Sequence, residues 1–88
     1  EEIIASGTYS TAMGRLAIAS GTDSTAMGKS TLASGDSSFA VGDSAEALGR
    51  YSTALGYSTK AIGTSSIAVG NNSAAMGSLT LIIISAAS

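Results

Sequence analysis

Few side chains in this sequence could carry out catalytic or metal chemistry. The 88 residues include no histidine and no cysteine, which removes the usual metal ligands, the usual proton shuttle and every thiol reaction. A catalytic serine needs a neighbouring base, so we interpret the many serines as structural. The aspartates Asp23, Asp36 and Asp43 lack the Gly-Gly-x-Gly-x-Asp spacing of calcium-binding β-rolls. We therefore expect no enzyme activity, no cofactor and no metal site.

The glycines are the residues whose spacing is most regular. All eleven recur every seven residues, whereas a phosphate-binding loop has clustered glycines followed by a helix. Asn71-Asn72-Ser73 is formally a glycosylation acceptor, but a turn role explains it first. We interpret the glycines as structural corners, where a sharp bend needs a positive φ or a close approach of backbones. These corner positions are Gly7, Gly14, Gly21, Gly28, Gly35, Gly42, Gly49, Gly56, Gly63, Gly70 and Gly77.

The seven-residue period excludes helices and favours strands. A helix with glycine in every second turn would be destabilised by about 1 kcal/mol at each glycine and has no apolar seam here to compensate. Collagen needs glycine at every third position and abundant proline, and this chain has no proline. Five residues of the form S-x-A-x-G instead alternate with a period of two, and two further residues form a turn. Each heptad is therefore predicted to form one short strand and one corner.

Two heptads make one coil of the predicted fold. The residue before glycine alternates between heptads, as in Ser6, Met13, Ser20 and Met27, which a unit of 14 residues explains. Two such strands close a flat coil, and coils stacked about 4.8 Å apart form an all-β parallel β-roll or β-solenoid. Glu46 and Lys60 lie one coil apart, so this register also stacks opposite charges.

Small residues mark the side of each strand that faces inward. Alanine stands two places before every glycine, and only Ser, Thr or Ala stands four places before it from the second heptad on. The position between them accepts Phe, Ile, Glu and Lys, so it faces outward. The predicted interior includes Ala12, Ala26, Ala40, Ala47, Ala54, Ala61, Ala68 and Ala75.

Larger outward residues on every second heptad predict an interface between subunits. None of them is charged, and a continuous uncharged face on a thin solenoid indicates either an interface or an aggregation hazard. An 88-residue chain with so small an interior also needs neighbours for stability. The candidate interface comprises Met13, Met27, Phe39, Val41, Leu55, Ile67 and Val69.

Charge and hydropathy exclude two kinds of partner. The net charge is −2, without a basic patch, so no nucleic acid is expected to bind. The apolar run at residues 81–84 is far shorter than the roughly 20 residues of a membrane helix, and the start of the chain has no signal-peptide pattern, so no direct membrane insertion is expected. Stacked threonines at 11, 25 and 53 leave an ice-binding β-solenoid as an alternative, although Phe39 and Ile67 interrupt them.

The segments SIAVGNNSAAMG, STALGYSTKAIG and SSFAVGDSAEALG resemble the YadA-like head repeats of trimeric autotransporter adhesins. The resemblance covers residues 5–77 and implies a left-handed parallel β-roll, assembled as a homotrimer and displayed on a bacterial surface through outer-membrane anchoring parts outside this sequence. It implies attachment to host extracellular-matrix proteins, cells or surfaces, through a ligand of protein nature. The head of a phage or viral fibre is the alternative setting. Residues 1–77 are assigned to the head repeats and 78–88 to a capping strand or transition segment.

Overall fold

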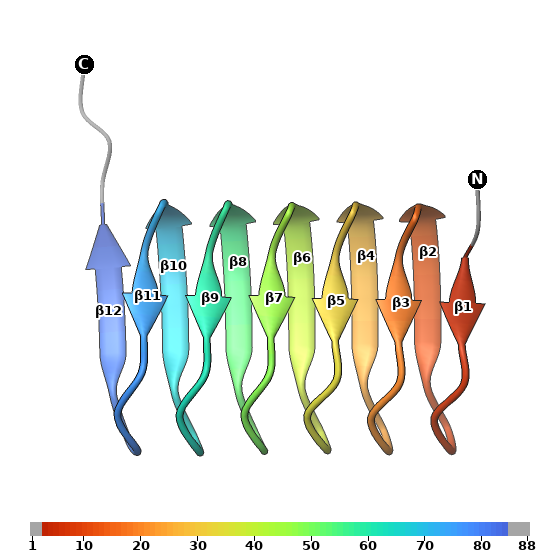
Figure 1. Ribbon diagram of the computed structural model, residues 1–88, viewed down its shortest axis with the longest axis horizontal. Helices are drawn as coiled ribbons and strands as arrows, with labels where there is room; N and C mark the ends of the chain where they lie inside the picture. The colour runs from red at the N-terminus through yellow and green to blue at the C-terminus, as the bar shows by residue number, and fades with distance from the viewer. Residues whose placement is uncertain (1–2, 85–88) are drawn as a thin grey trace.

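The chain winds into a flat solenoid of two parallel β-sheets, and the computed structural model describes residues 3–84 (Figure 1). The short-strand sheet contains β1 (Ile4–Ala5), β3 (Ile18–Ala19), β5 (Leu32–Ala33), β7 (Glu46–Ala47), β9 (Lys60–Ala61) and β11 (Ala74–Ala75). The long-strand sheet contains β2 (Thr11–Arg15), β4 (Thr25–Lys29), β6 (Phe39–Asp43), β8 (Thr53–Tyr57), β10 (Ile67–Asn71) and β12 (Leu81–Ile84). The Cα atoms span 34 × 27 × 11 Å, so the molecule is only two sheets thick.

Neighbouring strands within each sheet are parallel and 14 residues apart. Ala26 pairs with Ala40 and Ala40 with Ala54, and Met27 pairs with Val41. The same shift relates Glu46 to Lys60 in the short-strand sheet. The predicted all-β solenoid with 14-residue coils is therefore confirmed.

The two strands of a coil differ in length, which the sequence pattern does not indicate. Strands of the long-strand sheet have four or five residues, whereas those of the short-strand sheet have two. The Ala33 carbonyl accepts hydrogen bonds from the Ser20 N–H at 3.0 Å and the Gly21 N–H at 3.3 Å. Because two successive N–H groups share one acceptor, the chain bends there and the short strand ends.

The glycines occupy two different places in the coil. Gly35 follows short strand β5 at a bend, whereas Gly42 lies inside β6 with a φ of 132°. A Cβ on either would overlap the carbonyl oxygen of the glycine in the next coil. The glycines inside strands, rather than at a bend, are Gly14, Gly28, Gly42, Gly56 and Gly70. These five glycines therefore do not form corners themselves, and the chain turns at the residues that follow them.

The turn itself is made by a residue that is not glycine. The residue two places after each glycine has a φ of 54–62° in all eleven heptads. Aspartate, asparagine and serine occupy most of these sites, but Tyr9, Leu16, Tyr51 and Leu79 also do. Left-handed backbone is costly for residues with large side chains. Glycine thus permits the close stacking of coils, and its second neighbour turns the chain.

The core consists almost entirely of methyl and hydroxyl groups. The largest side chains that are fully buried are Thr31 and Thr59. The buried alanines, each with no exposed surface, are Ala17, Ala19, Ala26, Ala33, Ala40, Ala45, Ala47, Ala54, Ala61, Ala68 and Ala75. Ala12, in the first complete long strand, is only partly buried. The space between two sheets this close together excludes anything larger than threonine.

Candidate functional site

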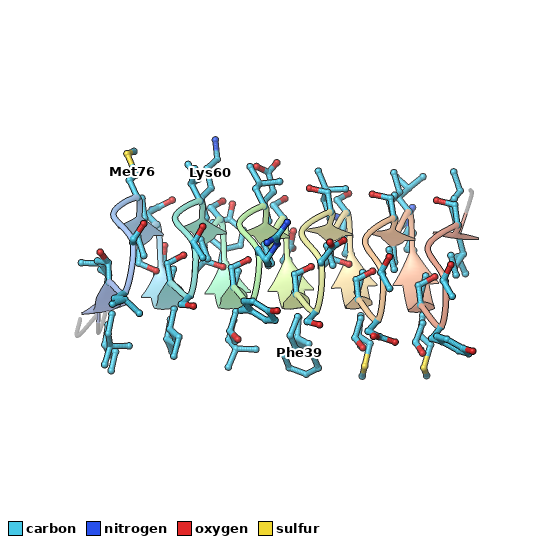
Figure 2. The ribbon with its side chains drawn as sticks, turned by 90° about the horizontal axis from the view of Figure 1, so that it is seen from below. Phe39, Lys60 and Met76 are labelled. Carbon is cyan, nitrogen blue, oxygen red and sulfur yellow. The ribbon has the colours of Figure 1, made fainter. Side chains whose placement is uncertain are left out.

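Two outer faces carry the variable side chains that point away from the two sheets, and the corners carry the rest. Along each strand the buried alanine alternates with outward residues, so the outward residues of one sheet point away from those of the other. Figure 2 shows Phe39 of the long-strand sheet on one side, with Lys60 and Met76 on the opposite side. Residues 3–84 enclose no pocket. Any binding by this part of the chain must therefore use an open face.

The uncharged face, as we call the outer face of the long-strand sheet, consists of two columns in strand register. The first contains Thr11, Thr25, Phe39, Thr53, Ile67 and Leu81. The second contains Met13, Met27, Val41, Leu55, Val69 and Ile83. All seven residues of the candidate interface lie in these columns. The structure extends that set by Leu81 and Ile83, which continue the columns on β12.

Large apolar side chains of the uncharged face remain partly open to solvent in the single chain. Met13 is 55% exposed, Phe39 39% and Ile67 38%, while Val41 and Leu55 are half-buried. Stacking in register covers each side chain on two sides but leaves its outward surface free. An uncovered apolar stripe of this length is characteristic of a surface that meets another protein.

Charged residues border the uncharged face along one edge. Arg15 pairs in register with Lys29, Lys29 with Asp43, and Asp43 with Tyr57. Each of these residues is the last residue of its strand and lies next to a corner. The apolar stripe therefore has a polar rim, which is the usual arrangement of a protein interface.

The outer face of the short-strand sheet is mixed in composition. One column contains Ile4, Ile18, Leu32, Glu46, Lys60 and Ala74 in register. A second column stands directly after the end of each short strand and contains Ser6, Ser20, Ser34, Leu48, Ile62 and Met76. Its coils are joined by hydrogen bonds such as Leu48 N–H to the Ala61 carbonyl at 2.9 Å. The apolar residues thus change from the first column to the second halfway along the stack.

The buried hydroxyls belong to two classes. Ser24, Ser52 and Ser66 donate to the carbonyl of the glycine three residues earlier at 2.6–2.7 Å. Thr31, Thr59, Ser38 and Ser73 have buried hydroxyl oxygens without a hydrogen-bond partner among the described residues. The serines that precede a long strand therefore brace the bend, with Ser38 as the exception. Thr31, Thr59 and Ser73 share one position of the coil, where Ala17 and Ala45 stand in two other coils.

The described part of the chain has neither a candidate metal cluster nor a membrane-spanning helix. Residues 3–84 contain no cluster of three or more acidic side chains that could hold a metal ion. They also contain no helix long and apolar enough to cross a membrane. The sequence pattern did not predict the turn residues with positive φ. Frequent Asp, Asn and Ser two places after glycine was the available signal for them.

The fold and its open faces define a β-solenoid repeat protein that presents continuous lateral surfaces. A family model of the YadA head domain repeat, which spans two copies of the repeat, matches residues 5–31, 33–59, 47–73 and 61–80. These matches cover most of the sequence, and the chain belongs to this family. Such repeats are adhesin-type structural domains from the heads of trimeric autotransporter adhesins, which are exposed on bacterial surfaces. Among curated proteins, no match to the chain is found.

Proposed function

We propose that this chain is the adhesive head of a trimeric surface adhesin, which attaches to host extracellular-matrix proteins, cells or surfaces. The observation that carries the proposal is the uncharged face within a chain of the YadA head family. Three copies that bury this face against one another would cover the half-exposed Met, Phe, Val, Leu and Ile side chains. The trimer would then display three mixed faces and the corners to a ligand.

Stability considerations also support a trimer. The interior of one chain buries alanine methyl groups and small hydroxyl side chains, and none of its fully buried side chains is larger than threonine. Burial of apolar surface contributes about 25 cal/mol per Å², so covering the partly exposed stripe would add stability that the small interior does not supply. Adhesion by an open face of such a trimer would rely on many weak contacts multiplied by the number of copies.

The segment after Gly77 is proposed to cap the roll. β12 pairs with β10 and places Ile82 in line with Ala68, where earlier coils have alanine. Ile82 is partly buried and packs against the alanine core. A larger side chain fits there because it covers the end of the core. Residues 85–88 of this segment lie outside the described part of the chain.

The attachment function is tested by binding to coated surfaces. The chain, immobilised on beads, should adhere to at least one of collagen, fibronectin and laminin, and a matched bead with Gly42→Ala protein should adhere less, since that variant is expected to disrupt β6 and β8. Adhesion of neither protein to any of these surfaces or to cultured cells would contradict the proposal.

Multi-angle light scattering on the free chain should give three times the mass of one chain, and a folded monomer would contradict the trimer.

The threonines do not support ice binding as a second function. Thr25 is followed in register by Phe39, and Thr53 by Ile67, so no two adjacent coils beyond the first pair present threonine. An ice-binding face needs a regular array over many coils. We expect no thermal hysteresis from this chain.

A further inference from the structure

The mixed face carries one pair of opposite charges in the middle of an otherwise uncharged surface. Glu46 and Lys60 are register partners on β7 and β9. The flanking positions in their column are Leu32 and Ala74, and the second column beside them has Leu48 and Ile62. Ile62 is 39% exposed and Met76 66% exposed. The face therefore combines exposed apolar groups with a single charge dipole that runs along the stack.

We propose that this mixed face docks onto the mixed face of a second copy of the chain, with the two stacks antiparallel. The inference deepens the proposed function, since it leaves the uncharged face to the trimer and names another copy of the head as a partner. The two-fold axis lies along the strand direction, between β7 and β9. Glu46 of each copy then lies opposite Lys60 of the other copy. Each charge therefore has one opposite charge beside it in its own chain and a second one across the interface.

The same register matches the apolar residues. With Glu46 opposite Lys60, Leu48 lies opposite Ile62 of the second copy. Leu32 then lies opposite Ala74, and Ser34 opposite Met76. Each copy thus contributes the same patch, as a two-fold interface requires. Facing sheets pack about 10 Å apart, so these side chains meet between the two sheets.

Alternative registers are disfavoured by like charges. A shift by one coil in either direction places Glu46 opposite Glu46, or Lys60 opposite Lys60, of the second copy. A parallel arrangement of the stacks places each charged residue of the first column opposite an apolar residue of the second column. Like charges in contact across an interface repel each other and strongly disfavour that register. The pattern of charges therefore selects one register and one orientation.

The corner residues beside the face are compatible with this register. The corner next to Leu48 carries Arg50, which would lie opposite Thr64 of the second copy, and Asp36 would lie opposite Ser78. No like charges meet at this edge. The patch of eight side chains is smaller than a stable interface of about 1,000 Å² requires. Each contact is consequently weak, and a trimer, whose three mixed faces point in different directions, meets a given second trimer through one of them.

Charge exchange tests this contact directly. Sedimentation velocity on the full chain should show, as the concentration rises, a species with twice the mass of the assembly that exists at low concentration. We call the appearance of this species doubling. Glu46→Lys and Lys60→Glu should each weaken doubling at least tenfold, as two attractive pairs become repulsive. Net charge per chain goes from −2 to 0 in the first variant (−2 + 2) and to −4 in the second (−2 − 2). A general effect of net charge would therefore act in opposite directions in the two variants.

Sedimentation of a mixture of the two variants provides the decisive measurement. Each lysine introduced by Glu46→Lys faces a glutamate introduced by Lys60→Glu, so equal amounts of the two proteins should double together when neither does alone. Arg50→Glu, which changes the charge as Lys60→Glu does, should leave doubling unchanged. The inference is overturned if the wild-type chain does not double up to about 1 mM, if either variant doubles like wild type, if the mixture fails to double, or if Arg50→Glu acts like Lys60→Glu.

The outcome also separates this inference from the proposed function. Doubling from one chain to two, with no species of three, would contradict the trimer and support the contact between mixed faces. A stable trimer that never doubles would support the trimer and overturn the contact.

Discussion

At the scale of single residues, the buried hydroxyls differ in whether they have a hydrogen-bond acceptor within the thin interior. The Ser52 hydroxyl donates to the Gly49 carbonyl at 2.6 Å, whereas the Thr59 hydroxyl, in the opposite half of the coil, is buried without a partner within residues 3–84. A buried hydrogen bond contributes about 1 kcal/mol, and an unsatisfied buried polar group costs a similar amount or more. The two hydroxyls should therefore affect stability with opposite signs.

We expect Ser52→Ala to lower the free energy of unfolding by about 1 kcal/mol, because the bend loses its brace and the Gly49 carbonyl loses a donor. Thr59→Val keeps the branched shape without the hydroxyl and should leave that free energy unchanged or raise it by up to about 1 kcal/mol. Urea unfolding followed by circular dichroism measures both. A larger loss for Thr59→Val than for Ser52→Ala would contradict this division of the hydroxyls.

The turn residues provide a second prediction at this scale. Leu16 has a φ of 61° and is 44% exposed, so its side chain gains little from packing while its backbone is in the left-handed region. Leu16→Gly should raise the free energy of unfolding by about 0.5–1 kcal/mol, the left-handed penalty less the extra entropy of glycine in the unfolded chain. Leu16→Ala is the control, since alanine retains the penalty. The prediction fails if the two variants have the same thermal midpoint.

The residue pattern was sufficient to predict most of the fold but not its asymmetry. Alanine two places before every glycine predicted the interior. The alternation of Ser and Met directly before glycine predicted the 14-residue coil. The unequal strand lengths depend on which carbonyl accepts two hydrogen bonds, as Ala33 does, and the heptads do not encode that choice visibly. The left-handed residues were missed because Tyr51 and Leu79 are unusual there. The stacking of Glu46 on Lys60 followed from the 14-residue spacing, and the register of β7 and β9 confirms it.

At the scale of elements, the spacing between coils depends on the glycines inside the long strands. A Cβ on Gly42 would overlap the Gly56 carbonyl, and the φ of 132° is strained for any other residue. Gly77 differs because a Cβ there would meet only the Thr80 hydroxyl, at 2.8 Å, and a side chain can rotate away. The two glycines thus stand in the same sequence pattern but under different constraints.

Gly42→Ala should therefore destabilise the roll by about 3 kcal/mol or more, because β6 and β8 must separate or change backbone conformation. Gly77→Ala should cost about 1 kcal/mol or less. Thermal unfolding by circular dichroism compares the two, and hydrogen exchange should show lost protection centred on β6 and β8 in the first variant. Equal costs would mean that the glycine column is not set by contact between coils.

At the scale of the whole molecule, the two faces should respond differently to the same charge. Val41 on the uncharged face and Leu32 on the mixed face are both half-buried strand residues that point outward. In the proposed trimer, a lysine in place of Val41 would be buried against two neighbouring chains without a partner, at a cost of several kcal/mol. A lysine in place of Leu32 would lie outside the trimer interface, and it would remain in solvent at concentrations too low for the mixed faces to dock.

We therefore expect Val41→Lys to shift the assembly from three chains to one at micromolar concentration, and Leu32→Lys to leave three. Light scattering gives the mass, and circular dichroism at several concentrations shows whether dissociation also unfolds the roll. Because folding and assembly are linked when the interior is this small, the thermal midpoint of the wild-type chain should rise with concentration. Retention of the trimer by Val41→Lys, or its loss in Leu32→Lys, would place the interface on the mixed face instead.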